Sequence, residues 1–520
     1  MSDRHRVEEH RTKDIKKAAK GYITAYLGSV VGRGLNFFKQ VILARFLGVE
    51  IFGLYTIGFV VVKIVELLAR FGLNGGALKF VPIYRDTDSS KLKGTVFSAL
   101  IIPFFNGIIM GTILYLLSDV LSSPLIFNKP ELKNIIRVFA FGVPFLAVNT
   151  VLIDIIQGFH MTQYSTYMRE FIQPAFNVLL IAISIYSGLD LSWIICAFIV
   201  SNIVSLIWGI YILKNISPCL TDRTIVPSYE MKSLLSFSGM CVFTGILYMG
   251  LSWTDTIMLG YLGTSKDVGV YRAASQVPLL LTTFLFAANT ISAPLISELF
   301  HHNQIDRLKK MFKSTTRWIF YLTLPTSIVL LFSAKEIMSI FGSEYIEGGS
   351  YVLMILTIGQ FVNCCTGIVA FTLTMTGNQR IELLNSLVMV ISNIFFNYIL
   401  IPKFGVIGAA IATGLTVTSI NIVRLVEVYV ILKIQPYDLH YMRGIASGIV
   451  TAIALFLLSY MGVPSLPNLS TLLLNGIVGA CVFFTMMFFM GIADEDRFVL
   501  NMIKDKLNTK ALGRHRDKIQ

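Results

Sequence analysis

The feature that most constrains this chain is the alternation of long apolar runs with short clusters of charged residues. Charged residues make up only 14% of the 520 residues, hydrophobic residues make up 55%, and the mean hydropathy is +0.71. A helix needs about 20 apolar residues to cross the hydrocarbon of a bilayer. Membrane strand barrels instead need alternating segments of ~10 residues, whereas the apolar runs here are continuous. We therefore predict an all-α integral membrane protein.

About fourteen segments are long and apolar enough to be transmembrane helices. They are 22–47, 53–73, 95–117, 135–158, 167–187, 191–213, 234–262, 268–293, 318–334, 350–375, 384–402, 405–432, 443–462 and 470–492. Basic tails, 1–21 and 493–520, flank them. The basic segment 301–317 precedes the shortest span, and we interpret it as a stretch that lies along the inner surface of the membrane.

The distribution of Lys and Arg predicts the orientation of the chain. If the N-terminus is cytoplasmic and the spans alternate, the outer connections hold only Lys129, Lys133, Lys266, Lys335 and Lys403 of the 43 basic residues. Cytoplasmic loops of membrane proteins carry an excess of Lys and Arg. We therefore predict a multi-pass protein of the cell (plasma) membrane with both termini in the cytoplasm.

The chain also carries a duplication at an offset of 215 to 219 residues. Aligned pairs are Leu47–Gly48 with Leu262–Gly263, Gly53 with Gly269, Tyr55 with Tyr271, Gly158 with Gly377 and Asn177 with Asn393. Each half thus begins with a helical hairpin whose glycines permit a tight turn, and we predict that Tyr55 and Tyr271 lie in an interfacial aromatic belt.

Six helices per repeat is an even number, so the two halves run parallel. The predicted domains are an N-terminal six-helix lobe (22–220), a C-terminal six-helix lobe (221–435) and two additional helices, 13 and 14 (436–492).

Charged residues inside the spans are the candidates for function, because each costs about 2.5–3.5 kcal/mol at a helix centre. The candidates within the spans are Arg33, Lys39, Arg45, Lys63, Arg70, Arg137, Arg272, Arg424, Glu66, Asp154, Asp255 and Glu427. Basic residues predominate, and a cavity of that sign attracts anions. Arginine suits phosphate in particular, because its planar guanidinium forms paired hydrogen bonds.

We predict a cationic, substrate-binding cavity in the membrane. Its candidate residues are Arg33, Lys39, Arg45, Lys63 and Arg272. Arg33 shares a helix face with Asn36 and Gln40, so this polar stripe should not face lipid.

Several of these charges also have structural interpretations. Lys63, Glu66 and Arg70 share a helix face, and an internal Lys–Glu pair is the alternative for them. Arg45 is equally explained as an anchor at the outer interface. Asp255 and Glu66 are candidates either for coupling an ion or for an ion pair between the lobes, Asp255 with Arg33 or Lys39.

Other chemistry has little support in the sequence. The six cysteines form no CxxC pair, and the seven histidines lie in tails or polar connections. Motifs for nucleotide hydrolysis or zinc hydrolysis are absent. We expect no catalytic residues, no metal, no cofactor and no nucleic-acid partner.

Five stretches of the chain resemble one known family. They are "GRGLNFFKQVILARFLGVEIFGLY", "FGLNGGALKFVPIY", "WTDTIMLGYLG", "IFGSEYIEGGSYVLMILTIGQ" and "KFGVIGAAIATGLT". They are similar to Wzx-type polysaccharide biosynthesis flippases of the multidrug/oligosaccharidyl-lipid/polysaccharide exporter superfamily. The resemblance implies two six-helix lobes that alternate access. It also implies movement of a polyprenyl-diphosphate-linked saccharide from the inner to the outer leaflet. Lipid II flippases of that superfamily carry two extra C-terminal helices, as this chain does.

The expected function is therefore that of a lipid-linked oligosaccharide flippase for cell-surface polysaccharide or glycan synthesis. Expected partners are the lipid-linked saccharide, membrane lipid, and a polysaccharide polymerase or glycosyltransferases. The alternative from the same superfamily is a cation-coupled multidrug extruder, which the excess of basic residues disfavours. A membrane-embedded glycosyltransferase would need a large outer loop with catalytic acids, and a non-transporting scaffold would not need polar stripes through the membrane.

Overall fold

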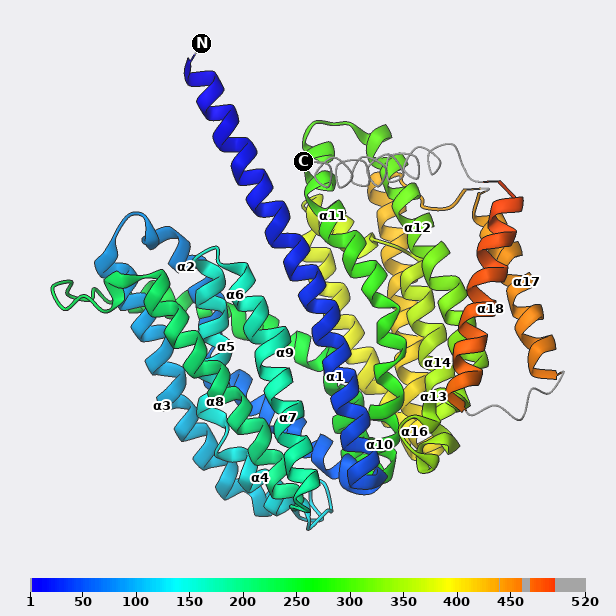
Figure 1. Cartoon of the computed structure of the whole chain (residues 1–520), viewed down its shortest axis with the longest axis horizontal. Coiled ribbons are helices and arrows are strands. Elements are labelled where there is room, and N and C mark those ends of the chain that lie inside the picture. Colours follow the sequence, from blue (N-terminus) through cyan, green and yellow to red (C-terminus); the bar gives the residue numbers. More distant parts are fainter. Residues whose placement is uncertain (1, 439, 461–467, 492–520) are drawn as a thin grey trace, which may run out of the picture. The chain divides into compact units, whose positions relative to one another are not determined.

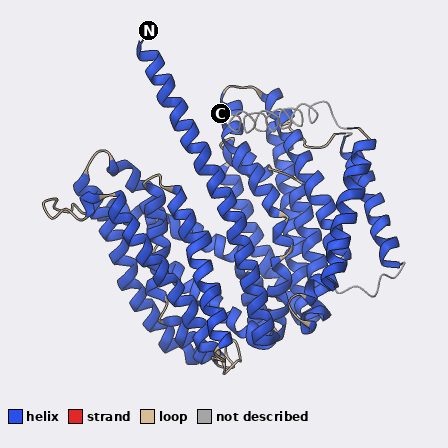
Figure 2. Ribbon diagram, in the orientation of Figure 1, coloured by secondary structure: helices blue, strands red, loops and turns tan. Residues whose placement is uncertain are grey.

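The computed structural model describes residues 2–438, 440–460 and 468–491, with side chains from Val31 onward except that of Ile291. Within these residues every regular element is a helix or a helical turn, which confirms the all-α prediction (Figure 2). The predicted C-terminal tail, 493–520, lies outside the described residues. The predicted N-terminal tail, from Ser2 onward, continues the first helix instead of preceding it.

Two compact units divide the chain. The first contains the residues up to Ala273 together with Asn397–Val406, and the second contains Ala274–Phe396 and the residues from Ile407. The α-helices of the first unit, labelled in Figure 1, are α1 (Ser2–Arg70), α2 (Leu73–Arg85), α3 (Ser89–Ser122), α4 (Leu132–Ala140), α5 (Val143–Gly158), α6 (Thr162–Thr166), α7 (Gln173–Tyr186), α8 (Leu191–Ile216), α9 (Met231–Leu262) and most of α10 (Ser265–Gln276). The unit also contains the π-helical turn η1 (Tyr167–Ile172) and the 3-10 turn η2 (Pro218–Leu220).

The second unit contains the remaining elements. They are η3 (Pro278–Leu280), α11 (Thr282–His301), α12 (Ile305–Phe332), α13 (Ala334–Ser339), η4 (Ser343–Tyr345), α14 (Ile346–Cys365), α15 (Val369–Met375), most of α16 (Gln379–Leu432), α17 (His440–Tyr460) and α18 (Asn468–Phe489). These units differ from the predicted lobes because α9 packs against α1 and α2 in the first unit. The lobes inferred from the duplication stay a prediction.

The helices account for most of the predicted spans, but 268–293 is broken after Gln276 and 350–375 is broken after Cys365. Among the described residues, ten helices are long and apolar enough to cross a membrane, or twelve if each of two bent pairs is one span. One bent pair, α4 with α5, turns by 52°. The long helices α1 and α16 each contain two predicted spans, separated at Gly48 (φ 71°) and Gly405 (φ 55°). A positive φ favours glycine, so these two positions end one span and start the next without an intervening loop.

One predicted segment differs from the structure. The segment 301–317 does not form a separate surface stretch, because α12 begins at Ile305 and continues into the span 318–334. Its last residue, Arg317, is fully buried. The charges of the first turns of α12 thus belong to the end of a transmembrane helix.

The core of the first unit joins helices that are distant in the sequence. Leu73 and Val81 of α2, Val96 of α3 and Val151 of α5 are buried in one apolar cluster. Glycines let α2 approach α9 closely, since a Cβ atom on Gly72 would lie 2.1 Å from the Ser238 carbonyl oxygen. This packing fixes α9 against the elements that carry the charged residues of the site.

The connection from α8 to α9 is held on the first turns of α3. The buried Lys93 ammonium donates to the carbonyl oxygens of Asp222 and of Ile225, the latter at 3.1 Å. The Ser228 N–H donates to the Ser90 carbonyl at 2.9 Å. The connection between the two predicted lobes is therefore part of the packed first unit.

The two predicted additional helices correspond to α17 and α18, which lie side by side in the second unit (Figure 1). Their contacts with α12 include Tyr441 of α17 against Phe320 of α12, with ring centroids 4.8 Å apart. The Tyr321 hydroxyl donates to the His440 carbonyl at 2.9 Å. Asn475 of α18 donates to the Ser333 hydroxyl at 2.9 Å.

Candidate functional site

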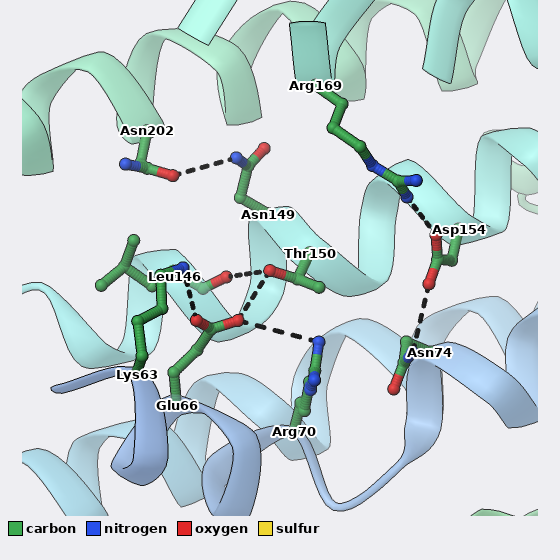
Figure 3. Close-up of polar contacts among 10 residues, drawn as sticks. All are labelled: Lys63, Glu66, Arg70, Asn74, Leu146, Asn149, Thr150, Asp154, Arg169 and Asn202. Atoms are coloured by element: carbon green, nitrogen blue, oxygen red, sulfur yellow. Dashed lines mark hydrogen bonds and ion pairs between the residues drawn. The ribbon is translucent and has the colours of Figure 1, made fainter. Parts of the chain in front are cut away.

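The candidate site lies in the first compact unit, where polar side chains of α1, α2, α5 and η1 meet inside the predicted membrane region (Figure 3). Glu66 of α1 is its buried centre, with a side chain only 5% exposed. The Lys63 ammonium lies 2.7 Å from Glu66 Oε2. The other oxygen, Oε1, accepts a hydrogen bond from the Thr150 hydroxyl at 2.8 Å and lies 3.9 Å from Arg70 Nη1.

The helical spacing of this group explains its contacts. Residues three and four positions apart share a helix face, so Lys63 and Arg70 both reach the carboxylate of Glu66. The predicted internal Lys–Glu pair is confirmed. Two cations and a hydroxyl enclose this carboxylate, and compensation of its charge lowers the energetic cost of burying it inside the membrane.

A second ion pair lies beside the first. Asp154 of α5 accepts from Arg169 of η1 at 2.7 Å and from the Asn74 amide of α2 at 3.2 Å (Figure 3). Asp154 is one helical turn after Thr150, so the Asp154 carboxylate and the Thr150 hydroxyl face the same side of α5. The Arg169 side chain is half exposed, which leaves its guanidinium accessible as well as paired.

Neutral side chains continue the polar network away from the charges. The Asn149 amide donates to Asn202 of α8 at 3.2 Å, and the Ser205 hydroxyl donates to Asn149 at the same distance. All three side chains are buried. They fasten α5 to α8 and thereby hold Thr150 in position.

Further cations lie on the part of α1 before Gly48 and on α10. The buried Lys39 ammonium donates to Asn36 at 3.0 Å, and the charges of Arg272 and Lys63 act directly on it. Arg272 of α10 stacks over the Trp253 ring of α9, 4.4 Å from the ring centre. The kink at Gly48 brings Lys39 and Lys63 together although 24 positions separate them. Lys39 is thus an electrostatic neighbour of two other predicted cavity residues, Lys63 and Arg272.

The other two predicted cavity residues are placed differently. Arg33 is half buried, and its charge acts on the Glu170 carboxylate of η1, which packs against Gly32. Arg45 is exposed near the outer end of its span. That exposure is also what an interfacial anchor would have. Their membership of the site therefore stays a prediction.

Asp255 of α9 has two described acceptor contacts. The Tyr271 hydroxyl donates to Oδ2, and the Asn397 amide donates to Oδ1 at 2.8 Å. Pairing of Asp255 with Arg33 or Lys39 stays a prediction. The expected interfacial belt of tyrosines is wrong at both positions, because Tyr55 and Tyr271 are buried, and Tyr271 serves as the donor to Asp255.

Several site residues escape prediction from the sequence. Arg169 and Glu170 lie at the inner margin of the span 167–187, where basic and acidic residues are normally solvated. Thr150 and Asn74 are uncharged, so only their proximity in space reveals a role. Among the described residues no group of His, Cys, Asp or Glu is arranged to hold a metal ion.

One cavity among the described residues lies elsewhere in the first unit. It has a volume of about 370 Å³ between α3 and the bend of α4 and α5. Its lining is apolar and includes Gly107, Gly111, Tyr115, Phe141 and Pro144. Because it holds none of the predicted site residues, it is distinct from the charged network.

The sequence matches two protein-family models and resembles known proteins over most of its length. The model of the polysaccharide biosynthesis protein family matches residues 18–300, and the MatE family model matches residues 241–399. The chain is 25% identical over 410 residues to the probable low-salt glycan biosynthesis flippase Agl15 of Haloferax volcanii, covering 76% of this chain and 80% of that protein. It is 23% identical over 380 residues to a putative O-antigen transporter of Shigella flexneri, covering 72% and 89%.

A solved structure shares the fold over almost its whole length. The lipid II flippase MurJ in an inward closed conformation is similar with a TM-score of 0.72 at 14% sequence identity, covering 90% of this chain and 98% of MurJ. The inward-facing conformation of a multidrug resistance MATE family transporter gives a TM-score of 0.64 at 16% identity, covering 77% and 94%.

Proposed function

Because the chain belongs to the polysaccharide biosynthesis protein family, we propose that it is a flippase that moves a polyprenyl-(di)phosphate-linked oligosaccharide across the cell membrane. It does so by alternating access and supplies the synthesis of a cell-surface polysaccharide or glycan. The observation that carries the proposal is the similarity to a flippase across three quarters of the chain. The cationic site in the first unit has the chemistry that such a substrate requires.

The substrate presents two problems in a membrane, a charged diphosphate and a hydrated saccharide. Charge placed in hydrocarbon is costly, and nearby cations lower that cost. The charges of Lys63 and Arg272 both act on Lys39, and these three residues hold the diphosphate in this proposal. Arg33 and Arg45 complete the proposed cavity. The prenyl tail stays in the lipid.

Glu66 gives the site a resident counter-ion. It neutralises Lys63 while the site is empty, and the diphosphate competes with it for the same ammonium. Because either anion can pair with Lys63, replacing one by the other never leaves the buried ammonium without a counter-charge, and this lowers the free-energy cost of exchange. This exchange lets the headgroup bind and leave. Asp255 remains a candidate for ion coupling.

The contacts of the carboxylates argue against the extruder alternative. An exporter of organic cations needs acids that face its substrate. Glu66 is paired with Lys63, and Asp154 is paired with Arg169. A cationic drug would have to displace a protein cation from each of these carboxylates.

The proposal also assigns the surroundings of the protein. It is a transporter and not an enzyme, it lies in the cell membrane, and both of its termini are cytoplasmic. Polysaccharide polymerase or glycosyltransferases supply or consume its substrate.

Translocation in vesicles tests the function. Purified protein is reconstituted with a fluorescent prenyl-diphosphate saccharide, and the fraction of the label that a membrane-impermeant quencher reaches is followed over time. Lys63→Met should slow translocation about tenfold or more, because it removes a charge-assisted contact worth about 1.5–3 kcal/mol. Arg33→Ala tests the second predicted cation in the same way. The matched control is Lys133→Met, since Lys133 also pairs with a carboxylate, Asp119, but lies outside the site.

Two outcomes would contradict the proposal. Unchanged translocation in both Lys63→Met and Arg33→Ala would remove these residues from the path of the substrate. Efflux of cationic dyes without translocation of the saccharide would assign the chain to the extruder branch.

A further inference from the structure

We propose that Lys129 is a positioning residue whose hydrogen bonds hold the outer end of the transport path closed. We call these hydrogen bonds the clasp, and they must break during each transport cycle. The clasp lies in what we call the outer seam, residues 49–53, 127–129 and 260–269, all of which belong to the first compact unit. That these hydrogen bonds break during transport rests on the proposed function, and that they lie on the outer side rests on the predicted orientation. The geometry of the clasp stands on contacts within one unit.

Lys129 lies in the connection between α3 and α4 and is buried, with only 8% of its surface exposed. Its ammonium donates to the carbonyl oxygens of Gly260 at 2.7 Å, Phe127 at 3.0 Å and Gly263 at 3.2 Å. Gly260 lies in the last turn of α9, and Gly263 caps that helix. The final carbonyls of a helix have no partner within it, and a cation there also opposes the negative end of the helix dipole.

A pair of glycines joins the same seam from α1 and α10. A Cβ atom on Gly53 would lie 1.8 Å from the Ser265 carbonyl oxygen, and a Cβ atom on Gly269 would lie 2.1 Å from the Val49 carbonyl oxygen. Each glycine thus contacts the residue four positions before the other. The arrangement is reciprocal, as a local two-fold axis would make it. Gly53 and Gly269 are also the pair that the duplication aligns.

The seam therefore joins the first predicted repeat to the second. Residues 49–53 and 127–129 belong to the lobe 22–220, whereas residues 260–269 belong to the lobe 221–435. Alternating access requires the outer ends of the two lobes to separate when the headgroup leaves. The contacts that must break are the backbone approach of Gly53 to Gly269 and the hydrogen bonds of Lys129.

Lysine is suited to a clasp that opens repeatedly. Its ammonium bonds carbonyl oxygens while the seam is closed, and water can replace every one of those contacts when the seam opens. The carbonyls of Gly260 and Gly263 are hydrated at the same moment, so the open state leaves no buried polar group without a partner. A methionine of similar length would fill the same space without donating hydrogen bonds.

Cysteine accessibility tests the clasp without any substrate. The reporter is Val268→Cys, because Val268 lies in the seam and is fully buried. It is placed in a background whose native cysteines are replaced by alanine and which retains translocation. Right-side-out vesicles are exposed to an impermeant maleimide. Lys129→Met should increase the labelling rate of the reporter about tenfold, as expected for loss of charge-assisted hydrogen bonds, and should slow translocation.

Matched controls separate a clasp from general loosening. Lys133→Met, four residues along the same segment, should leave labelling unchanged, because its ammonium pairs with Asp119 outside the seam. A second reporter, Val151→Cys, lies in the fully buried core of α5 and should stay unlabelled in every variant.

Gly53→Ala should open the seam by displacing the Ser265 carbonyl and so raise labelling as well. Gly34→Ala in the same helix should not, because open space surrounds Gly34.

The proposal is overturned if Lys129→Met leaves the Val268→Cys labelling rate unchanged. It is also overturned if both reporters gain accessibility together, since that is loss of packing and not opening of a seam. Labelling that rises only in inside-out vesicles would place the seam on the other side of the membrane and refute an outer clasp. If labelling responds as expected but the saccharide is not translocated by any variant, the clasp stands and the proposed function fails.

Discussion

Substitution of Asp438 should destabilise the second compact unit by removing the partner of a buried charge. Arg317 of α12 has a side chain only 1% exposed, and its Nη1 lies 2.8 Å from Asp438 Oδ2. Asp438 lies in the connection between α16 and α17 and retains 21% side-chain exposure. The ion pair therefore ties the additional helices to α12 at the point where α17 begins.

The two partners should not contribute equally. Breaking a buried ion pair costs about 3–5 kcal/mol when an uncompensated charge stays buried. Asp438→Asn removes this counter-charge from the buried Arg317 guanidinium, and partial access of water at the aspartate reduces the expected cost to about 2–3 kcal/mol. Arg317→Met leaves the more exposed carboxylate, which water solvates, so we expect about 1 kcal/mol or less from the lost pairing.

Equilibrium unfolding in mixed micelles measures both free energies. The double variant Arg317→Met/Asp438→Asn should cost less than the sum of the single variants, because it leaves no unpaired charge. If the two single effects add within about 0.5 kcal/mol, the residues are independent and the argument is refuted. An Arg317→Met variant more destabilised than Asp438→Asn would also contradict it.

Three further predictions follow from single sites. Gly48→Ala should lower the free energy of unfolding by about 1–3 kcal/mol, because φ is 71° at this position. Gly34→Ala should raise it by about 0.5–1 kcal/mol, because Gly34 is helical and open space surrounds it. Thermal unfolding of the two variants measures the difference. Glu66→Gln should lower the free energy of unfolding by about 1–3 kcal/mol and Thr150→Val by about 1 kcal/mol, because Glu66 binds both the Lys63 ammonium and the Thr150 hydroxyl. Chemical unfolding measures both values, and a larger loss for Thr150→Val would contradict the prediction. Hydrogen bonds from the Thr224 hydroxyl and N–H hold the pKa of Asp222 below its ordinary value of about 3.9. The protection of the amides of residues 222–228 against hydrogen exchange should therefore be constant from about pH 7 to about pH 4 and fall only at lower pH. Thr224→Ala should shift this loss of protection to higher pH.

The sequence predicts the membrane architecture well because its physical cause is local. A helix that crosses hydrocarbon must be apolar along its own length, so each span can be read from consecutive residues. The spacing of Lys63 and Glu66 is equally local, and their pair was predictable. Gly48 also follows from a local signal, since it lies between two apolar runs, although the structure joins these runs without a loop.

Contacts between segments that are distant in the sequence cannot be predicted from the residues of one segment. Lys129 counts in the sequence as one of a few cations outside the membrane, and only the fold shows that it is buried on helix carbonyls. Arg169 lies at a span margin, where a lysine or arginine is usually solvated, yet it pairs with Asp154. Tyr271 has the position and chemistry of an interfacial residue, and its burial depends on how α9 and α10 pack.

The attachment of the α8–α9 connection to α3 makes one peptide bond in this chain dispensable for assembly. Lys93 binds the carbonyls of both Asp222 and Ile225, so a nick between Arg223 and Thr224 would leave each new end anchored to the same ammonium. Two separately encoded fragments, 1–223 and 224–520, should therefore associate when they are produced together. Such a split protein would let each repeat be labelled or mutated alone, because the union of the halves depends on packing and not on a continuous backbone.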